Sequence, residues 1–416
     1  MATGTFHEPK LPGLAGIEGF ERPHFHSGRW NYDITGGDSS GNLNKLADKT
    51  VGVIGTGSSA VQFIPYLAHS AKKLYVFQRT PSSVTPRAKF QVDPAAVASR
   101  EPGWQRAQMR QFADIMQGDD TSDQRFTAAE GFDSLTMQAI LIEGRQAGIT
   151  EIPAEQVPEL LQLADLRLME RLRKLVADTV VDPTTAAQLQ PWYPFFCKRP
   201  AFNNEYLAVF NRPNVELVDT DGRGVSHLTR TGVVAGGREY DVDVLVYATG
   251  FDFEIGADFF RRTGIHLIGA RGQTLDQAWA TAGGPSTLFG IHARGFPNLF
   301  IIGPAQAGVG ANWTHTAYVA GEHIAEVVAA MLTEPSAYRV LEPTAEAEED
   351  WGKQVEEGSA MRLLFAQSCS PGYFNHEGEP EKIPKRWGYY PKGPVAWEKL
   401  MKEWREEGSM KGMERR

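Results

Sequence analysis

The segment 50–62 carries a short apolar run followed by Gly55, Gly57 and Ala60. The run suits a buried parallel strand, and Gly55 lets the chain reverse where a side chain would clash. Gly57 leaves room for a pyrophosphate against the first N–H groups of a helix that begins near Ser58, and Ala60 permits close packing of that helix on the strand. The spacing therefore predicts a dinucleotide site. Its binding residues would be Gly55, Thr56, Gly57, Ser58, Ser59, Ala60, Val61 and Gln62.

A second apolar run, 74–77, leads to the residues that distinguish two coenzymes. In NAD sites this strand usually ends in Asp or Glu, which binds the ribose 2′-OH and would repel a 2′-phosphate. Here the strand ends in Gln78 and Arg79, followed by Thr80. The planar fork of arginine binds phosphate with two hydrogen bonds, and a threonine hydroxyl adds a donor. A solvated strand-end arginine is the alternative, but the glycine turn at this spacing favours NADPH.

The elements that would position these residues follow from the hydrophobic pattern. Residues 1–45 are rich in Gly, Pro and aromatic residues and predict an irregular connection, whereas the pattern from 94 to 187 predicts a helical insertion. Gly303-Pro304, after the last apolar run, suits a cofactor crevice before a helix. Strands are expected at 51–54, 74–77, 215–219, 242–247 and 298–302, and helices at 160–172 and 314–332. The tail 399–416 mixes both signs of charge densely and predicts a solvated helix.

Composition limits the classes of partner. The 416 residues carry a net charge of −9, which argues against a nucleic-acid partner. The longest apolar candidate, 324–332, is interrupted by Glu326 and falls short of the ~20 residues that a membrane span needs. The N-terminus lacks the pattern of a signal peptide. The two cysteines, Cys197 and Cys369, have no metal-like neighbours. We therefore expect no disulfide framework, no metal site and a cytoplasmic location.

The segment 19–31 contains Phe20, His26 and Trp30 just ahead of the glycine turn. Taken alone, His26 would be read as a structural histidine. The order and spacing of the three residues resemble the identifying motif of the Baeyer–Villiger monooxygenases, a family of flavoproteins. Arg22 and Asn31 depart from that motif. In the family the counterpart of His26 links the cofactor domains and does not act as an acid or base.

A second segment, 194–200, contains Lys198 and Arg199. Without the resemblance, the two would be read as a surface basic pair. The resemblance matches Arg199 to the active-site arginine of the family, and Lys198 to a residue near the 2′-phosphate of NADPH. A guanidinium stays charged at any working pH. It would stabilise a negatively charged flavin peroxide and the anionic adduct that the peroxide forms with a ketone.

Further segments extend the resemblance. Ala2-Thr3-Gly4 and Ala248-Thr249-Gly250 resemble the points where the chain of such flavoproteins crosses between the FAD and NADPH domains. Gly303-Pro304 with Asn312 resembles the segment that lies against the flavin, which makes Asn312 a cofactor-binding candidate. The loop 370–378 resembles one found in members that act on larger ketones, although a surface turn explains it equally well.

The resemblance implies an α/β fold with two dinucleotide-binding domains. It starts at the first Ala-Thr-Gly of the family pattern, and no second glycine fingerprint occurs, so we expect the first FAD Rossmann half to be missing. The implied parts are a remnant of the FAD domain with a linker (1–45), the first part of the NADPH domain (46–93), the helical insertion (94–190), the second part of the NADPH domain (191–247), and the C-terminal part of the FAD domain with a tail (248–416).

The implied activity is the NADPH- and FAD-dependent conversion of a ketone to an ester or lactone with O2. The late loops hint at a bulky secondary-metabolite ketone. Two alternatives remain open. One is a flavin monooxygenase that oxidises nitrogen or sulfur, and the other is a truncated NADPH-binding remnant without catalytic activity.

Overall fold

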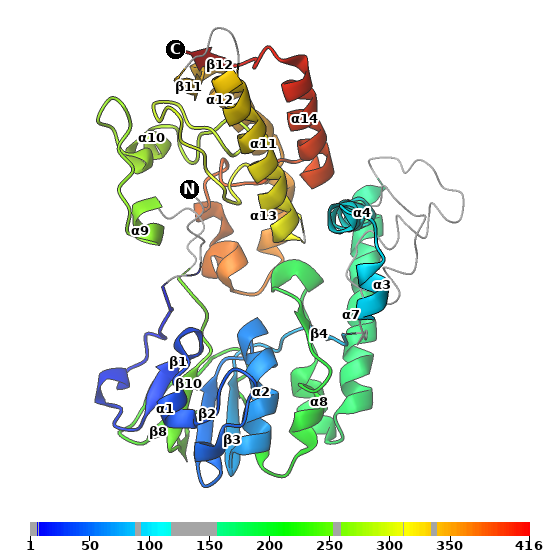
Figure 1. The fold of residues 1–416 in the computed structure, drawn as a ribbon. Helices are drawn as coiled ribbons and strands as arrows, with labels where there is room; N and C mark the ends of the chain where they lie inside the picture. The colour runs from blue at the N-terminus through cyan, green and yellow to red at the C-terminus, as the bar shows by residue number, and fades with distance from the viewer. Residues whose placement is uncertain are drawn as a thin grey trace.

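A computed structural model describes residues 6, 8–87, 93–117, 156–252, 259–310, 312–333 and 339–416. Figure 1 shows two parts, one built around a parallel sheet and the other mainly helical. Ala2-Thr3-Gly4 and the segment 118–155 of the expected helical insertion lie outside the described residues.

A five-stranded parallel sheet forms the first part, in the order β1-β10-β2-β3-β6. Ile54 pairs with Phe77 on one side and with Tyr247 on the other, so the carboxyl ends of the three central strands are level. The strands are β1 (His24–His26), β2 (Thr50–Ile54), β3 (Lys73–Gln78), β6 (Val215–Asp219) and β10 (Val244–Tyr247).

Each face of the sheet is covered by a different layer. Helices α2 (Ser58–Ser70) and α8 (Pro183–Leu189) lie on one face, over a core that includes Ile64, Leu74 and Val246. The other face packs on a three-stranded antiparallel sheet, where Tyr240 meets Phe77 edge to face. The small sheet contains β7 (His227–Leu228), β8 (Gly232–Ala235) and β9 (Arg238–Asp241), and α1 (Tyr32–Thr35), α7 (Val157–Thr179), β4 (Val84–Thr85) and β5 (Ala201–Phe202) complete this part.

The helical part has its core around Trp351, Trp397 and Met401, all almost fully buried. Helix α4 packs against α11 and α14, where Arg110 forms a 3.1 Å ion pair with Glu398. The helices are α3 (Pro94–Ala98), α4 (Trp104–Gln117), α9 (Phe259–Thr263), α10 (Leu275–Thr281), α11 (Trp313–Thr333), α12 (Ala345–Glu357), α13 (Ser359–Gln367) and α14 (Gly393–Glu407), and β11 (Leu341–Pro343) pairs with β12 (Met413–Arg415).

Most of the expected elements are confirmed, among them β2, β3, β6, β10, α2, α7 and α11. The strand expected at 298–302 is wrong, because only Phe300 forms an isolated bridge there, with His292. Asn298 adopts a φ of 58°, and its side chain binds the backbone of Arg339 and Leu341. The chain therefore turns at the residue where the strand was expected to begin.

The tail is only partly the solvated helix that its charges predict. Helix α14 ends at Glu407, where Gly408 takes a left-handed conformation, and the chain then returns as β12. One face of α14 is buried through Trp397 and Met401. The first 45 residues likewise hold more structure than expected, since β1 forms the edge of the main sheet.

Candidate functional site

The glycine turn lies at the carboxyl end of β2, where the strand order of the sheet reverses between β2 and β10. Gly55 has a φ of +108°, and a Cβ atom there would stand 2.6 Å from the carbonyl oxygen of Ala248. Its N–H donates to the carbonyl oxygen of Phe77 at 3.0 Å. Only glycine fits this position without strain. A reversal of strand order is where open α/β sheets bind their ligands.

The N-terminus of α2 has the geometry of an anion site. No protein atom of the described chain lies within 4 Å of a Cβ placed on Gly57, and no side chain caps the helix. Ala60, by contrast, is fully buried in the core against the sheet. Gln62 donates from Nε2 to the carbonyl oxygen of Ser58 at 3.1 Å. The open space before exposed helix N–H groups fits a pyrophosphate.

Hydrogen bonds between the two strand ends fix the residues that follow β3. The Thr56 hydroxyl donates to the carbonyl oxygen of Thr80 at 2.9 Å. Gln78 is fully buried and donates from Nε2 to the carbonyl oxygen of Gln188 at 2.9 Å. The exposed side chain at this tip is therefore that of Arg79, which is 52% accessible.

The two cations predicted to bind the 2′-phosphate face one backbone oxygen. Arg79 Nη2 lies 3.5 Å and Lys198 Nζ 3.3 Å from the carbonyl oxygen of Pro371. Burial, together with the nearby charge of Arg79, lowers the pKa of Lys198. The structure thus brings these cations together from sequence positions 119 apart, beside the glycine turn.

Arg199 lies next to the N-terminus of α2. The Ser58 hydroxyl donates to its carbonyl oxygen at 3.3 Å. Burial raises the pKa of Tyr373 to about 12, and the charge of Arg199 opposes that rise, which places the guanidinium near the phenol. Within the described chain the guanidinium has no hydrogen-bond acceptor or carboxylate partner. It is an exposed, fixed positive charge beside the coenzyme candidate site.

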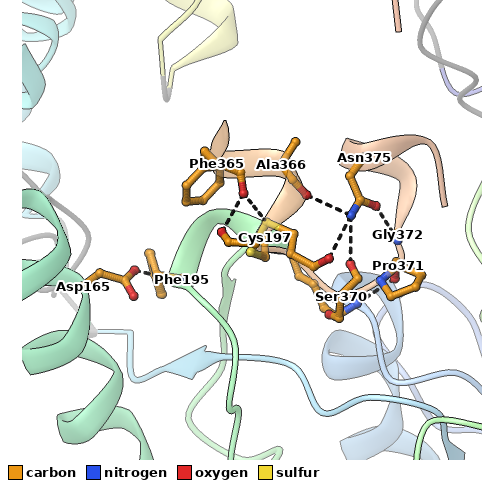
Figure 2. The surroundings of a disulfide bond; sticks show 12 residues. Asp165, Phe195, Cys197, Phe365, Ala366, Ser370, Pro371, Gly372 and Asn375 are labelled. Atoms are coloured by element: carbon orange, nitrogen blue, oxygen red, sulfur yellow. Dashed lines mark hydrogen bonds between the residues drawn. A yellow bond between two sulfur atoms is a disulfide. The ribbon is translucent and has the colours of Figure 1, made fainter. Parts of the chain in front are cut away.

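The expectation of no disulfide is wrong, because Cys197 and Cys369 are joined (Figure 2). The bond connects residues 172 positions apart, with Cα atoms 5.1 Å apart. Sequence spacing gives no sign of such a pairing between parts of the chain that meet only in the fold. The bond ties the segment that carries Lys198 and Arg199 to the start of the loop 370–378.

Asn375 organises that loop, as Figure 2 shows. Its side-chain oxygen accepts from the N–H groups of Gly372 at 2.9 Å and Gly378 at 3.2 Å. Its Nδ2 donates to the carbonyl oxygens of Ala366, Cys369 and Ser370. The residue is 2% exposed, so these bonds are shielded from water. The loop is held in one conformation and contacts Arg79 and Lys198 through the carbonyl oxygen of Pro371.

Two residues of the Phe20, His26 and Trp30 motif, His26 and Trp30, pack against the elements that carry the glycine turn. Burial lowers the pKa of His26, and its Nδ1 accepts from the N–H of Gly28 at 3.0 Å. The His26 ring meets Phe251, just after β10, at a centroid distance of 5.5 Å. The Trp30 ring packs on Phe63 of α2. These contacts join β1, β10 and α2 and leave His26 in a structural position.

The hydrogen bonds of Asn312 are local to the start of α11 and link it to none of the other described candidates. Its side-chain oxygen accepts from the Thr314 hydroxyl at 2.6 Å and from the N–H of His315 at 3.3 Å, which caps the start of α11. A residue that the sequence reading missed is Glu377, which lies 3.6 Å from Arg79. No sequence signal connects the two.

None of the described helices is long and apolar enough to cross a membrane. The described acidic, histidine and cysteine side chains form no group suited to a metal ion.

The chain is similar to fungal monooxygenases over its whole length. A ketocytochalasin monooxygenase of Aspergillus clavatus is 61% identical over 417 residues, which are 100% of this chain and 65% of that protein. The protein named Baeyer-Villiger monooxygenase peniC, of Penicillium patulum, is 56% identical over 421 residues, 100% of this chain and 68% of that protein. The chain thus spans about two thirds of the length of these relatives. No family model matches the sequence.

Among solved structures, a polycyclic ketone monooxygenase from Thermothelomyces thermophila matches with a TM-score of 0.89 at 38% identity. The match covers 100% of this chain and 67% of that one. The mixed α/β architecture with its parallel sheet is therefore the two-dinucleotide-binding flavoprotein fold.

Proposed function

Because the chain belongs to the Baeyer–Villiger monooxygenase family, we propose that it takes part in the NADPH- and FAD-dependent oxidation of a ketone to an ester or lactone. The balanced reaction consumes the ketone, O2, NADPH and a proton, and yields the ester, water and NADP+. One observation carries the proposal. The glycine turn, the cations Arg79 and Lys198, and the backbone of Arg199, whose guanidinium has no partner among the described residues, meet at one end of the sheet.

We assign NADPH to the space before α2. The N–H groups that follow Gly57 would bind the pyrophosphate, and Arg79, Thr80 and Lys198 would bind the 2′-phosphate. The open space around Gly57 is the feature of this chain that fits the coenzyme. In this proposal 46–93 and 191–247 form the NADPH domain, 94–190 is the helical insertion, and 1–45 and 248–416 belong to the FAD side.

Arg199 is the proposed catalytic residue. NADPH would supply the hydride and FAD would pass the reducing equivalents to O2. The guanidinium of Arg199 would stabilise negative charge that develops on oxygen next to the ketone carbonyl, since it stays ionised at any working pH. Asn312 is retained as the candidate on the flavin side, at the start of α11.

The substrate class is a bulky ketone. One relative is named for ketocytochalasin and one structural neighbour for polycyclic ketones. We extend that class, a polycyclic or macrocyclic secondary-metabolite ketone, to this chain. We also propose a cytoplasmic location. Recovery of the chain with cytosolic marker proteins after cell fractionation tests it, and recovery with membrane or secreted markers would contradict it.

The test of the function uses the full chain with NADPH, FAD and a polycyclic ketone under ¹⁸O2. We expect one ¹⁸O atom in the ester product, loss of most product formation in Arg199→Ala, and partial recovery in Arg199→Lys. Arg238→Ala is the matched control, because Arg238 is an exposed arginine on β9, on the opposite face of the sheet from α2.

Two results would reject the proposal in favour of its rivals. Oxidation of an amine or sulfide with no oxygen inserted into any ketone would favour the nitrogen- or sulfur-oxidising class. A colourless chain that binds NADPH without a flavin absorption band would favour a binding protein without catalytic activity.

A further inference from the structure

A carboxylate from the helical part of the molecule occupies the cationic end of the coenzyme candidate site. Glu377 Oε1 accepts from Lys10 Nζ at 3.0 Å, and Glu377 Oε2 lies 3.6 Å from Arg79 Nη2. Its side chain is 44% exposed, so water still reaches it. The charge of Lys198 also acts on this carboxylate. Three cations from distant parts of the chain therefore surround one anion.

The loop backbone is held in an unfavourable conformation that delivers this side chain. His376 and Glu377 have φ values of 51° and 55°, in the left-handed region that residues other than glycine rarely adopt. The Asn375 hydrogen bonds hold the loop together, and the Cys197–Cys369 disulfide joins its start to the segment that carries Lys198. Such conformations persist only where the surrounding structure imposes them, and they cluster at functional sites.

The loop presents to Arg79 and Lys198 an acceptor oxygen and a negative charge, the two features by which a phosphate would bind them. The carbonyl oxygen of Pro371 faces Arg79 and Lys198, and the Glu377 carboxylate adds a negative charge beside them. Burial alone would raise the pKa of Glu377, but Lys10, Arg79 and Lys198 outweigh it and lower the pKa. The carboxylate is consequently ionised at neutral pH.

We propose that Glu377 is a specificity-determining residue that occupies the 2′-phosphate position as an internal counter-ion. This inference rests on the NADPH site proposed above. A coenzyme with a 2′-phosphate must displace the carboxylate from Arg79, whereas a coenzyme with a free 2′-OH need not. Glu377 therefore weakens the binding of the 2′-phosphorylated coenzyme. It reduces the difference in affinity between that coenzyme and the unphosphorylated form.

The test isolates the phosphate by comparing adenosine 2′,5′-bisphosphate with adenosine 5′-monophosphate in calorimetric titrations of the full chain at low salt. In Glu377→Gln we expect the bisphosphate to bind about three- to tenfold more tightly, because repulsion of a dianion is removed. Binding of the monophosphate stays unchanged. Glu379→Gln is the matched control, since Glu379 directly follows the loop but pairs with Lys382 at 2.6 Å.

The remaining outcomes separate this inference from the site on which it rests. If Arg79→Ala weakens the bisphosphate and Glu377→Gln leaves it unchanged or weakens it, the counter-ion role is overturned and the coenzyme site stands. If Arg79→Ala does not affect the bisphosphate either, both proposals are overturned. Equal tightening of bisphosphate and monophosphate in Glu377→Gln would also overturn the role, because it would show no preference for the phosphate.

Discussion

The hydroxyl of Ser58 donates a 3.3 Å hydrogen bond to the backbone oxygen of Arg199. The two residues come from the glycine turn and from the segment after α8, 141 positions apart. This bond sets the start of α2 directly against the proposed catalytic arginine. Binding of a coenzyme at the helix N-terminus and the position of Arg199 are therefore structurally connected.

Two glycines of the turn are expected to respond differently to alanine. Gly55→Ala should lower the free energy of unfolding by more than about 2 kcal/mol, because its φ is positive and the new Cβ would meet Ala248. Gly57→Ala should change it by less than about 1 kcal/mol, since the methyl enters open space. NADP+ affinity should nevertheless fall about tenfold in Gly57→Ala.

Urea unfolding and calorimetric titration measure the two quantities separately. Unaltered NADP+ binding in a stable Gly57→Ala variant would exclude the pyrophosphate from this turn.

The charge of Lys198 should give NADP+ binding a characteristic pH dependence. Because burial and Arg79 lower the pKa of Lys198, its ammonium loses the proton at a lower pH than an ordinary lysine, whose pKa is about 10.4. Affinity should therefore fall as the pH rises through the alkaline range, before exposed lysines titrate. Lys198→Arg should bind with an affinity that is flat over this range, since arginine stays charged. Equal profiles for the parent and Lys198→Arg would contradict this role.

The disulfide should stabilise the fold and order the loop on the coenzyme site. Replacing both Cys197 and Cys369 by serine is expected to lower the free energy of unfolding by about 2–5 kcal/mol, because the bond closes a long loop in the unfolded chain. Dithiothreitol should destabilise the parent to a similar extent and leave the double variant unaffected. Two titratable thiols in the native protein, purified without reductant, would show that the bond is absent.

Local sequence patterns predicted the central strands of the main sheet and the glycine turn. The apolar runs and the Gly55 turn gave β2, β3, β6, β10 and the start of α2, because burial and backbone freedom are encoded within a few residues. Contacts between distant segments were not predictable in this way. The pairing of Cys197 with Cys369 and the approach of Glu377 to Arg79 depend on how the two parts of the molecule pack.

A buried histidine pair should make the protein sensitive to acid. His292 Nε2 and His323 Nε2 lie 3.0 Å apart, and Arg405 Nη1 donates to His323 Nδ1 at 3.1 Å. Burial lowers the pKa of His292 to about 3 and that of His323 well below its usual range. Below pH 6.5 these histidines take up protons in the unfolded chain but stay neutral in the native chain. Their contribution to the free energy of unfolding is therefore complete above that pH and is lost as the pH falls.

The expected slope is about 1.4 kcal/mol per pH unit for each histidine once the pH is well below 6.5. His292→Gln keeps an acceptor for His323 and should remove about half of the slope attributed to this pair. Urea unfolding at a series of pH values between 7 and 5 measures it. A slope that is the same in the parent and in His292→Gln would contradict the assignment.

The proposed coenzyme site is tested most directly by the dissociation constants of NADP+ and NAD+ for the parent chain and for Arg79→Ala. The guanidinium lies on the exposed tip of β3 and would contact only the 2′-phosphate. Calorimetry should show a parent that prefers NADP+, and a variant that loses about 10- to 100-fold in NADP+ affinity while its NAD+ affinity is unchanged. An NADP+ to NAD+ ratio that stays the same in Arg79→Ala would contradict the site.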